Sequence, residues 1–341
     1  MPALAVAAEL RAEGLEVVFI GGERAEARMV PEAGFELRPI RVEGLSRRHP
    51  IRAGRAALRA AVAVEAGRRL LAELGPGAVL GGGGYVSGPV GAAAVSRRVP
   101  LVLTEADSYL GLANRVLAPF ARRVCLAFAL DGRSGPRYRV TGRPIMPPVG
   151  DRAQARARLG MGAEDTVVVV FGGSLGARSI NQAALDGLSG ASFRVLHVAG
   201  SRDYPDLRDR PRGPGYDLRE LLPLPLFMDA LAGADLVVAR AGGSIFEIAA
   251  HGCPAVLVPY PHATADHQRH NAEWMRAAGA AVVIDDAELT GPRLAQEVGG
   301  LLADRGRLAA MGRASASLAR PRAAREVAQE LLAAAAARRS R

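Results

Sequence analysis

Short apolar runs alternate with helical patterns along almost the whole chain, and this alternation restricts the fold more than any other feature of the sequence. Strands separated by helices pair in parallel, so we expect α/β sheets with helices on both faces and ligand sites at the carboxyl ends of the strands. The predicted strands are Val17–Ile20, Ala78–Leu80, Pro100–Leu103, Val124–Phe128, Arg139–Thr141, Thr166–Phe171, Phe193–Val198, Leu218–Leu222, Asp235–Ala239, Ala255–Val258 and Ala281–Ile284.

The length of the chain, 341 residues, predicts two domains. A proline- and glycine-rich break, Gly142–Gly150, lies near the middle and reads as the linker between them. The domains would then cover residues 1–145 and 150–317. The apolar runs are too short to span a bilayer, and the two cysteines, Cys125 and Cys253, do not suggest a disulfide framework. These features predict a cytoplasmic protein.

The formal net charge is +10, and arginine carries all of the positive charge because the chain has no lysine. Such an excess attracts anionic surfaces. Nucleic acid is a poor candidate partner, because aromatic residues make up only 4% of the chain and do not interleave with basic ones. An anionic membrane surface remains open as a partner.

The stretch Ala239–Asn271 carries the strongest chemical signal. It reads as a strand, a glycine turn at Gly242–Ser244, a helix with Glu247, a second strand, and a polar loop that leads to Gln268 and Asn271. A glycine turn before a helix lets main-chain N–H groups and the helix dipole meet a phosphate. A carboxylate can accept hydrogen bonds from a ribose diol, and amides can bind sugar hydroxyls as donors or acceptors. The grouping predicts a nucleotide-sugar site.

Two further glycine loops follow predicted strands, Gly81–Gly84 and Gly172–Gly176. Four consecutive glycines cost backbone entropy, which indicates a close approach to a ligand, and tight packing of a strand against a helix is the alternative. Neither loop has the G-x-G-x-x-G spacing of a dinucleotide fold, and a chain without lysine has no P-loop.

Two carboxylates, Glu105 and Asp107, lie just after a predicted strand. They are candidates for a general base, and solvated loop acids are the alternative. The histidines His262, His267 and His270 lack the spacing of metal ligands, so we expect no metal and no cofactor. A helix dipole would stabilise the leaving group instead.

Arginines gather at two places in the first half of the chain. Arg52, Arg55 and Arg59 share one helical face, and Arg115, Arg122 and Arg123 flank Val116–Phe120. A solvated basic face explains such runs most simply. Apolar residues bracketed by arginine also suit shallow docking on an anionic bilayer.

Several segments, taken in order, resemble the MurG family of glycosyltransferase family 28. These segments are Pro2–Ala7, Gly83–Pro89, Gly172–Asn181 and Ala239–Asn271. The family transfers GlcNAc from UDP-GlcNAc to undecaprenyl-diphosphate-linked MurNAc-pentapeptide in peptidoglycan synthesis. The resemblance implies a GT-B fold, in which two Rossmann-like domains face a cleft and a C-terminal helix, 318–341, completes the first domain. It also implies a peripheral enzyme at the cytoplasmic face of the bacterial membrane.

The resemblance further implies a role for each matched residue. The main chain of Phe227 and Met228 would bind uracil, Glu247 the ribose, and Gln268 and Asn271 with His267 the GlcNAc. The diphosphate would lie at Gly173, Ser174, Gly242, Gly243 and Ser244. The acceptor would meet Gly83, Gly84, Tyr85, Ser87 and Asn114. Glu105 or Asp107 would assist an inverting attack by the muramoyl 4-hydroxyl group.

Three departures from the family pattern keep other functions open. The segment Thr104–Asp107 retains only the Glu of H-E-Q-N. The segment Gly142–Met146 has Met146 at the position of the final Arg of G-N-P-V-R. The first strand and the glycine loop with the family's proposed base histidine would precede Pro2, so we expect about 10–20 residues upstream of Met1. The alternatives are a UDP-GlcNAc 2-epimerase and a non-catalytic UDP-sugar-binding protein.

Overall fold

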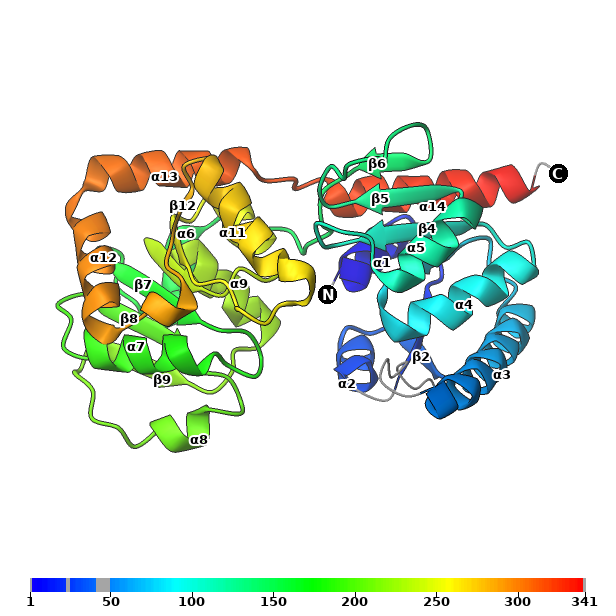
Figure 1. The fold of residues 1–341 in the computed structure, drawn as a ribbon. Coiled ribbons are helices and arrows are strands. Elements are labelled where there is room, and N and C mark those ends of the chain that lie inside the picture. Colours follow the sequence, from blue (N-terminus) through cyan, green and yellow to red (C-terminus); the bar gives the residue numbers. More distant parts are fainter. Residues whose placement is uncertain (1, 23–24, 41–49, 340–341) are drawn as a thin grey trace. The chain divides into compact units, whose positions relative to one another are not determined.

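The structure is a computed structural model that describes residues 2–22, 25–40 and 50–339. For residues 25, 50–60 and 339 it describes the backbone alone, so the side chains of Arg52, Arg55 and Arg59 lie outside the described residues. The chain divides into two compact units (Figure 1). Unit 1 comprises Met1–Met146 with Pro321–Arg341, and unit 2 comprises Pro147–Arg320. Within the described ranges, no helix combines the length and the apolar character that a membrane span requires.

The described residues of unit 1 form one four-stranded and one two-stranded sheet, and every strand pair in them is parallel. The orders are β3-β4-β5-β6 and β1-β2. The strands are β1 (Val18–Gly21), β2 (Glu36–Pro39), β3 (Val79–Gly81), β4 (Leu101–Glu105), β5 (Arg123–Leu126) and β6 (Tyr138–Val140). The helices are α1 (Pro2–Ala12), α2 (Ala25–Glu32), α3 (Pro50–Leu74), α4 (Gly84–Ser96), α5 (Leu112–Leu117), η1 (Ala118–Phe120) and α14 (Ala323–Arg339).

Unit 2 holds one parallel six-stranded sheet with the order β12-β11-β10-β7-β8-β9. Its strands are β7 (Val167–Phe171), β8 (Arg194–Val198), β9 (Tyr216–Arg219), β10 (Leu236–Ala239), β11 (Ala255–Leu257) and β12 (Ala281–Val283). Its helices are α6 (Arg152–Arg158), α7 (Arg178–Leu188), α8 (Tyr204–Leu207), α9 (Leu224–Gly233), α10 (Ile245–Ala250), η2 (Thr264–Asp266), α11 (His267–Ala277), η3 (Asp286–Glu288), α12 (Gly291–Ala303) and α13 (Arg305–Ser317).

The sheet order of unit 2 reverses between β7 and β10, since the chain builds outward from β7 in one direction and from β10 in the other. This is the strand order of a Rossmann fold, whose ligands bind beside the carboxyl ends of the two strands at the reversal. Residues Val167–Val170 of β7 have no exposed surface. An unbroken valine run fits a central parallel strand because helices cover both of its faces.

The last helix, α14, belongs to unit 1. It packs Val327 and Leu331 into a cluster with Val6 and Val102. On its neighbouring face Glu330 accepts hydrogen bonds from Arg123 (2.7 Å) and Arg139 (2.8 Å). A helix from the end of the chain therefore covers a sheet built from the beginning of the chain (Figure 1).

The structure differs from the predicted elements in three places. Strand β2 was not predicted, because Glu36–Pro39 is half-exposed, has no β-branched residue and ends in proline. Strand β9 begins at Tyr216, two residues before the predicted run, since pairing with β8 fixes it. Helix α14 begins at Ala323 and not at residue 318, because the turn that contains Pro321 precedes it.

Candidate active site

Three loops meet at the carboxyl edge of the unit 2 sheet. Phe171 of β7 pairs with Ala239 of β10, and Ala239 pairs with Leu257 of β11. The loop Gly172–Gly176, the turn Gly242–Ser244 and the segment that begins at Val258 therefore leave the sheet side by side. The sequence predicted the two glycine loops as ligand-binding, and the sheet reversal brings them together.

Close backbone contacts shape the loop Gly172–Gly176. A Cβ on Gly172 would lie 2.4 Å from the Ala177 nitrogen, and one on Gly176 would lie 2.0 Å from the Ala199 carbonyl oxygen. Gly173 and Gly176 also have φ of 96° and 86°, values that favour glycine. Ser174 is exposed at the tip, and its carbonyl accepts a hydrogen bond from the Ser201 N–H (3.0 Å). The tight-packing explanation holds for Gly172 and Gly176, while Gly173 and Ser174 face solvent.

A buried polar network lies next to the loop Gly172–Gly176. His197, with no exposed surface, lies 2.7 Å from Tyr216 Oη through Nδ1 and 2.9 Å from Asn181 Oδ1 through Nε2. Asn181 Nδ2 donates to the Ala199 carbonyl and to Asp203 (3.0 Å). Since the amide oxygen accepts, His197 Nε2 carries the proton and Nδ1 accepts from tyrosine. Burial, helped by Arg212, lowers the pKa of His197 to about 3, so the ring is neutral.

The segment that begins at Val258 places Gln268 beside the glycine turn Gly242–Ser244. Gln268 lies in the first turn of α11, and its Nε2 would lie 3.9 Å from a Cβ on Gly242. Its Oε1 accepts a hydrogen bond from the Tyr260 N–H (3.0 Å). The side chain therefore turns its NH₂ group toward Gly242, where that group can donate to an oxygen of a ligand. Glu247 is half-buried on α10, a helix of six residues.

Asn271 is buried, and its Nδ2 donates to the Ala241 carbonyl (2.9 Å), which fixes α11 to the end of β10. His267 lies at the start of the same helix, and its Nδ1–H donates to the Thr264 carbonyl (2.8 Å). Phe227 packs edge-on against Phe171, with ring centroids 5.0 Å apart, and its N–H donates to the Pro223 carbonyl within α9. Met228 is buried beside it.

The acceptor-side residues of the sequence also gather at one sheet edge, in unit 1. Gly81 ends β3 and pairs with Leu103 of β4. Gly83 and Gly84 have φ of 80° and 76° and lead into α4, which carries Tyr85 and Ser87. The Oγ of Ser87 is buried without a hydrogen-bond partner in the described part of the chain.

Glu105 is the last residue of β4, not a loop residue as predicted, and it is 8% exposed. Its Oε1 accepts from the N–H groups of Ala106 (3.0 Å) and Asp107 (3.3 Å). Its Oε2 accepts from the N–H of Gly111 (2.8 Å) and from Asn114 Nδ2 (3.0 Å). Four donors thus hold this carboxylate, an arrangement that orders the loop between β4 and α5. Asp107 is half-buried in that loop.

Asn114 completes this cluster. It is 1% exposed, and its Nδ2 also donates to the Thr104 carbonyl (2.8 Å). Both donor contacts fix the amide orientation, so Oδ1 can only accept. This oxygen is buried without a hydrogen-bond partner among the described residues.

The sequence did not single out Arg240, which directly follows β10. Its guanidinium donates to the carbonyls of Val258 and Pro259, to Ser179 and to Asp286. Its position at the carboxyl end of a predicted central strand, immediately before the glycine turn, was the available signal.

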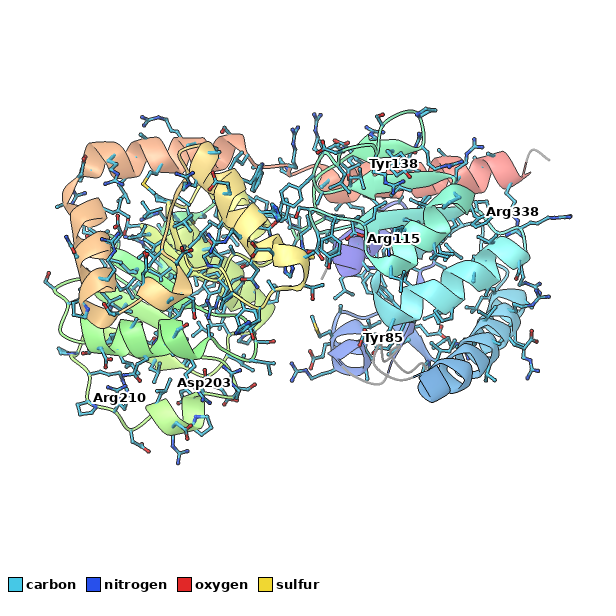
Figure 2. The ribbon with its side chains drawn as sticks, in the orientation of Figure 1. Tyr85, Arg115, Tyr138, Asp203, Arg210 and Arg338 are labelled. Atoms are coloured by element: carbon cyan, nitrogen blue, oxygen red, sulfur yellow. The ribbon has the colours of Figure 1, made fainter. Side chains whose placement is uncertain are left out.

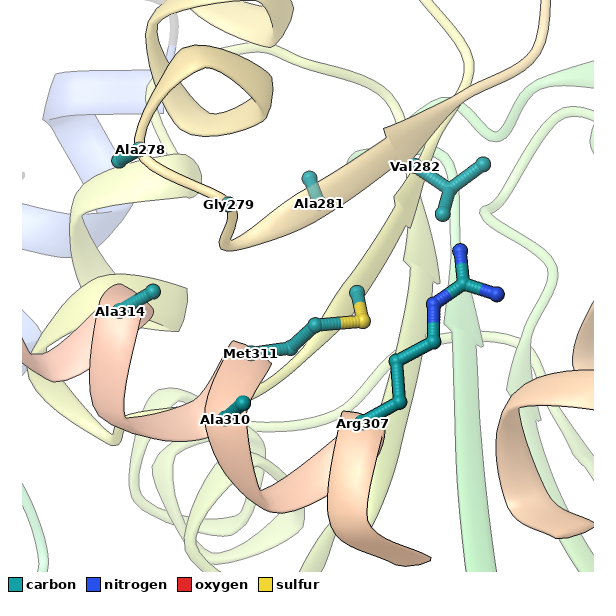
Figure 3. Close-up of a pocket in the computed structure, with 8 residues that line it drawn as sticks. All are labelled: Ala278, Gly279, Ala281, Val282, Arg307, Ala310, Met311 and Ala314. Atoms are coloured by element: carbon teal, nitrogen blue, oxygen red, sulfur yellow. The ribbon is translucent and has the colours of Figure 1, made fainter. Parts of the chain in front are cut away.

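A cavity of about 410 Å³ lies elsewhere in unit 2, at the edge strand β12 and helix α13 (Figure 3). Arg307 is its charged lining residue, beside Val282 and Met311. It does not share the sheet edge at which the glycine loops meet. Within residues 2–22, 25–40 and 50–339, no cluster of three or more His, Cys, Asp or Glu is arranged to hold a metal ion.

Known proteins establish the class to which this fold and these loops belong. The family model of the glycosyltransferase family 28 N-terminal domain matches residues 1–126, and that of the C-terminal domain matches residues 167–327. The chain belongs to glycosyltransferase family 28, and it is an enzyme of the GT-B fold. The predicted resemblance and fold class are confirmed.

Individual relatives define the branch of the family. The chain is 41% identical to a UDP-N-acetylglucosamine--N-acetylmuramyl-(pentapeptide) pyrophosphoryl-undecaprenol N-acetylglucosamine transferase of Moorella thermoacetica, over 97% of this chain and 94% of that protein. It is 40% identical to the transferase of the same name from Rubrobacter xylanophilus, over 96% and 98%. The crystal structure of Acinetobacter baumannii MurG matches with a TM-score of 0.73 and 26% identity, covering 97% and 95%.

A UDP-GlcNAc 2-epimerase from Neisseria meningitidis matches with a TM-score of 0.67 over 97% and 95% of the two chains, but at 13% identity. This likeness extends to the fold alone.

Proposed function

We propose that this protein transfers GlcNAc from UDP-GlcNAc to the 4-hydroxyl of undecaprenyl-diphosphate-MurNAc-pentapeptide, the step from lipid I to lipid II. The observation that carries the proposal is the meeting of the loops Gly172–Gly176 and Gly242–Ser244 at the reversal of the unit 2 sheet. Relatives about 40% identical along nearly the whole chain bear the name of this transferase. The 2-epimerase alternative has support only at the level of the fold.

In this proposal unit 2 binds the donor. The diphosphate lies against Gly173, Ser174 and the turn Gly242–Ser244. Glu247 accepts hydrogen bonds from the ribose hydroxyls. The Nε2 group of Gln268 donates hydrogen bonds to the sugar. The remaining donor-site roles follow the family pattern: uracil at Phe227 and Met228, and the sugar environment completed by His267 and Asn271.

Unit 1 binds the acceptor through the loop Gly83–Gly84, Tyr85, Ser87 and Asn114. The buried Oδ1 of Asn114 needs a hydrogen-bond donor, which a phosphate at neutral pH does not provide. This atom therefore suits a hydroxyl or N–H group of the acceptor, or a water that bridges to it. The Oγ of Ser87 can donate, so it suits a phosphate oxygen.

We assign the general base to Asp107 and not to Glu105. Both oxygens of Glu105 already accept hydrogen bonds, whereas the side chain of Asp107 forms none with the described residues. Asp107 would take the proton of the 4-hydroxyl as that oxygen attacks C1. The bond from C1 to the phosphate oxygen then breaks, and UDP leaves with the electron pair.

Paired substitutions test the assignment of the base. Asp107→Asn should lower kcat about 10²–10⁴-fold, the usual contribution of a general base, and leave the melting temperature nearly unchanged. Glu105→Gln should chiefly lower the stability, because an amide NH₂ would then face N–H donors. A larger kcat loss in Glu105→Gln than in Asp107→Asn, at equal stability, would reverse the assignment.

We also propose that unit 1 attaches to the cytoplasmic face of the membrane. Leu112, Val116 and Phe120 are 44%, 59% and 65% exposed on α5 and η1. The exposed Arg115 and Arg122 lie on the same segment, and Figure 2 shows Arg115 on this helix. Apolar side chains bracketed by cations suit an anionic bilayer surface, with each arginine adding about 1 kcal/mol.

Co-sedimentation with vesicles tests this attachment. The protein should bind vesicles that contain phosphatidylglycerol more strongly than neutral ones, and salt should weaken that binding. Val116→Ser with Phe120→Ser should reduce it. Equal binding to both kinds of vesicle would count against the proposal.

A single assay separates the candidate functions. The protein is incubated with UDP-GlcNAc and a lipid I analogue, and UDP release and products are followed. The transferase makes a disaccharide, an epimerase makes UDP-ManNAc, and a non-catalytic binder makes neither. Only the first outcome agrees with the proposal.

A further inference from the structure

Arg240 connects three parts of unit 2 that lie far apart in the sequence. Its side chain is 12% exposed. The guanidinium donates to the carbonyls of Val258 and Pro259 (3.2 Å each), to Ser179 Oγ (2.9 Å) and to Asp286 Oδ1 (2.5 Å). Ser179 in turn donates to Asp286 (2.6 Å). Because guanidinium is planar and permanently charged, these contacts fix both its position and its orientation.

The guanidinium also lies 5.4 Å from the centroid of the Tyr260 ring. Tyr260 is 43% exposed, so burial alone does not hold this residue. Arg240 also holds the carbonyls of Val258 and Pro259, which directly precede Tyr260. These hydrogen bonds and the cation–π contact fix the position of the Tyr260 main chain. Arg240 thereby controls the conformation of the segment that leaves β11.

The main chain of Tyr260 in turn orients Gln268. The Tyr260 N–H donates to Gln268 Oε1 (3.0 Å), and this contact fixes which end of the amide faces Gly242. The Nε2 group lies on the Gly242 side. Without the Tyr260 N–H in place, the amide could rotate by half a turn and present its oxygen to the ligand instead.

We propose that Arg240 is a positioning residue for the donor sugar, and this inference rests on the proposed function. It acts through Tyr260 and Gln268, so that the site presents an N–H donor to a hydroxyl oxygen of the hexose. Arg240 does not touch the substrate. Its effect should therefore fall on the sugar and not on the uridine diphosphate.

A double-mutant cycle in the full chain tests this inference. Binding of UDP and of UDP-GlcNAc is measured by calorimetry for the parent, Arg240→Ala, Gln268→Ala and the double variant. Arg240→Lys tests for partial rescue. Arg212→Ala is the matched control, because Arg212 also donates to three main-chain carbonyls in unit 2, those of Leu207, Arg208 and Arg210.

We expect Arg240→Ala to weaken UDP-GlcNAc binding about tenfold and to change UDP binding less than about twofold. The UDP-GlcNAc affinity of Arg240→Lys should fall between those of the parent and Arg240→Ala, since lysine keeps the charge but lacks the planar guanidinium with its several donors. The double variant should bind no more weakly than Gln268→Ala, and Arg212→Ala should bind both ligands like the parent.

Other outcomes overturn the inference. Additive losses in the double variant would mean that Arg240 does not act through Gln268. Equal losses for UDP and UDP-GlcNAc in Arg240→Ala would mean that the residue only maintains the fold. A parent protein that binds neither ligand would instead contradict the proposed function.

Discussion

At the scale of single residues, buried polar groups have defined partners, and these partners show what each group does. Glu105 orders a loop through four donors. His197 joins α7, β8 and β9 through Asn181 and Tyr216. Residue type alone does not distinguish such structural roles from catalysis. The hydrogen-bond partners do, because a group whose capacity is filled has none left for a substrate.

His197 should make the stability depend on pH. Its pKa in the folded protein is about 3, against an ordinary value of 6.5, so below pH 6.5 the unfolded chain binds a proton that the folded chain excludes. The free energy of unfolding should fall with decreasing pH between 6.5 and 3, with a contribution of at most about 1.4 kcal/mol per pH unit. Urea denaturation of His197→Gln should show a shallower pH dependence than the parent, and identical slopes would contradict this account.

At the scale of elements, strand order and close backbone approach build the donor site. The loop Gly172–Gly176 depends on the close contacts of Gly172 with Ala177 and of Gly176 with Ala199, and the sequence indicated only that a close approach occurs there. Gly200 approaches Gly176 so closely that a Cβ on Gly200 would lie 2.0 Å from the Gly176 nitrogen. No side chain fits between Gly176 and the segment Ala199–Gly200.

Gly176→Ala should therefore lower stability by about 1–3 kcal/mol and weaken UDP binding. Its added Cβ would lie 2.0 Å from the Ala199 carbonyl oxygen, and its φ of 86° disfavours alanine. Gly190→Ala is the control, because no atom lies within 4 Å of its added Cβ. Thermal melts and calorimetry measure both effects. Equal behaviour of the two variants would disprove the close-approach argument.

Helix α14 offers a second prediction at this scale. Glu330→Ala would remove the carboxylate that pairs with both Arg123 and Arg139 and joins them to α14, and Arg139 alone would keep a second pair on that helix, with Glu326 (3.1 Å). Because Glu330 is 9% exposed while both arginines are partly solvated, we expect a loss of about 1–3 kcal/mol in urea denaturation. Glu65→Ala, which removes exposed pairs on α3 with Arg68 and Arg69, should cost less than about 1 kcal/mol.

At the scale of the whole molecule, the two units differ in how the chain builds them. Unit 2 is one continuous segment, Pro147–Arg320, with its own buried core. Unit 1 takes its last helix from the end of the chain. Unit 2 can therefore be expressed alone as one segment. Unit 1 cannot, because its two segments lie at opposite ends of the chain.

Unit 2 expressed alone should fold and bind UDP, because all of the donor-site residues lie within it. Calorimetry should give an affinity close to that of the full chain. Glu247→Ala in this fragment should weaken UDP binding by about 1.5–3 kcal/mol, the range for a hydrogen bond to a charged group. A folded fragment that does not bind UDP would refute the donor-site assignment, and unchanged affinity in the variant would refute the ribose contact.

The sequence by itself determined the alternation of strands and helices, the glycine loops after β3, β7 and β10, and the family, because these depend on local pattern and ordered motifs. Tertiary structure alone decided the rest. Strand β2 forms by pairing with β1, since Glu36–Pro39 has little strand propensity of its own. The roles of Glu105 and Arg240 depend on partners up to 61 residues away, as between Arg240 and Ser179. Hydrogen-bond satisfaction of a buried group is a property of its neighbours in space, and no local pattern encodes it.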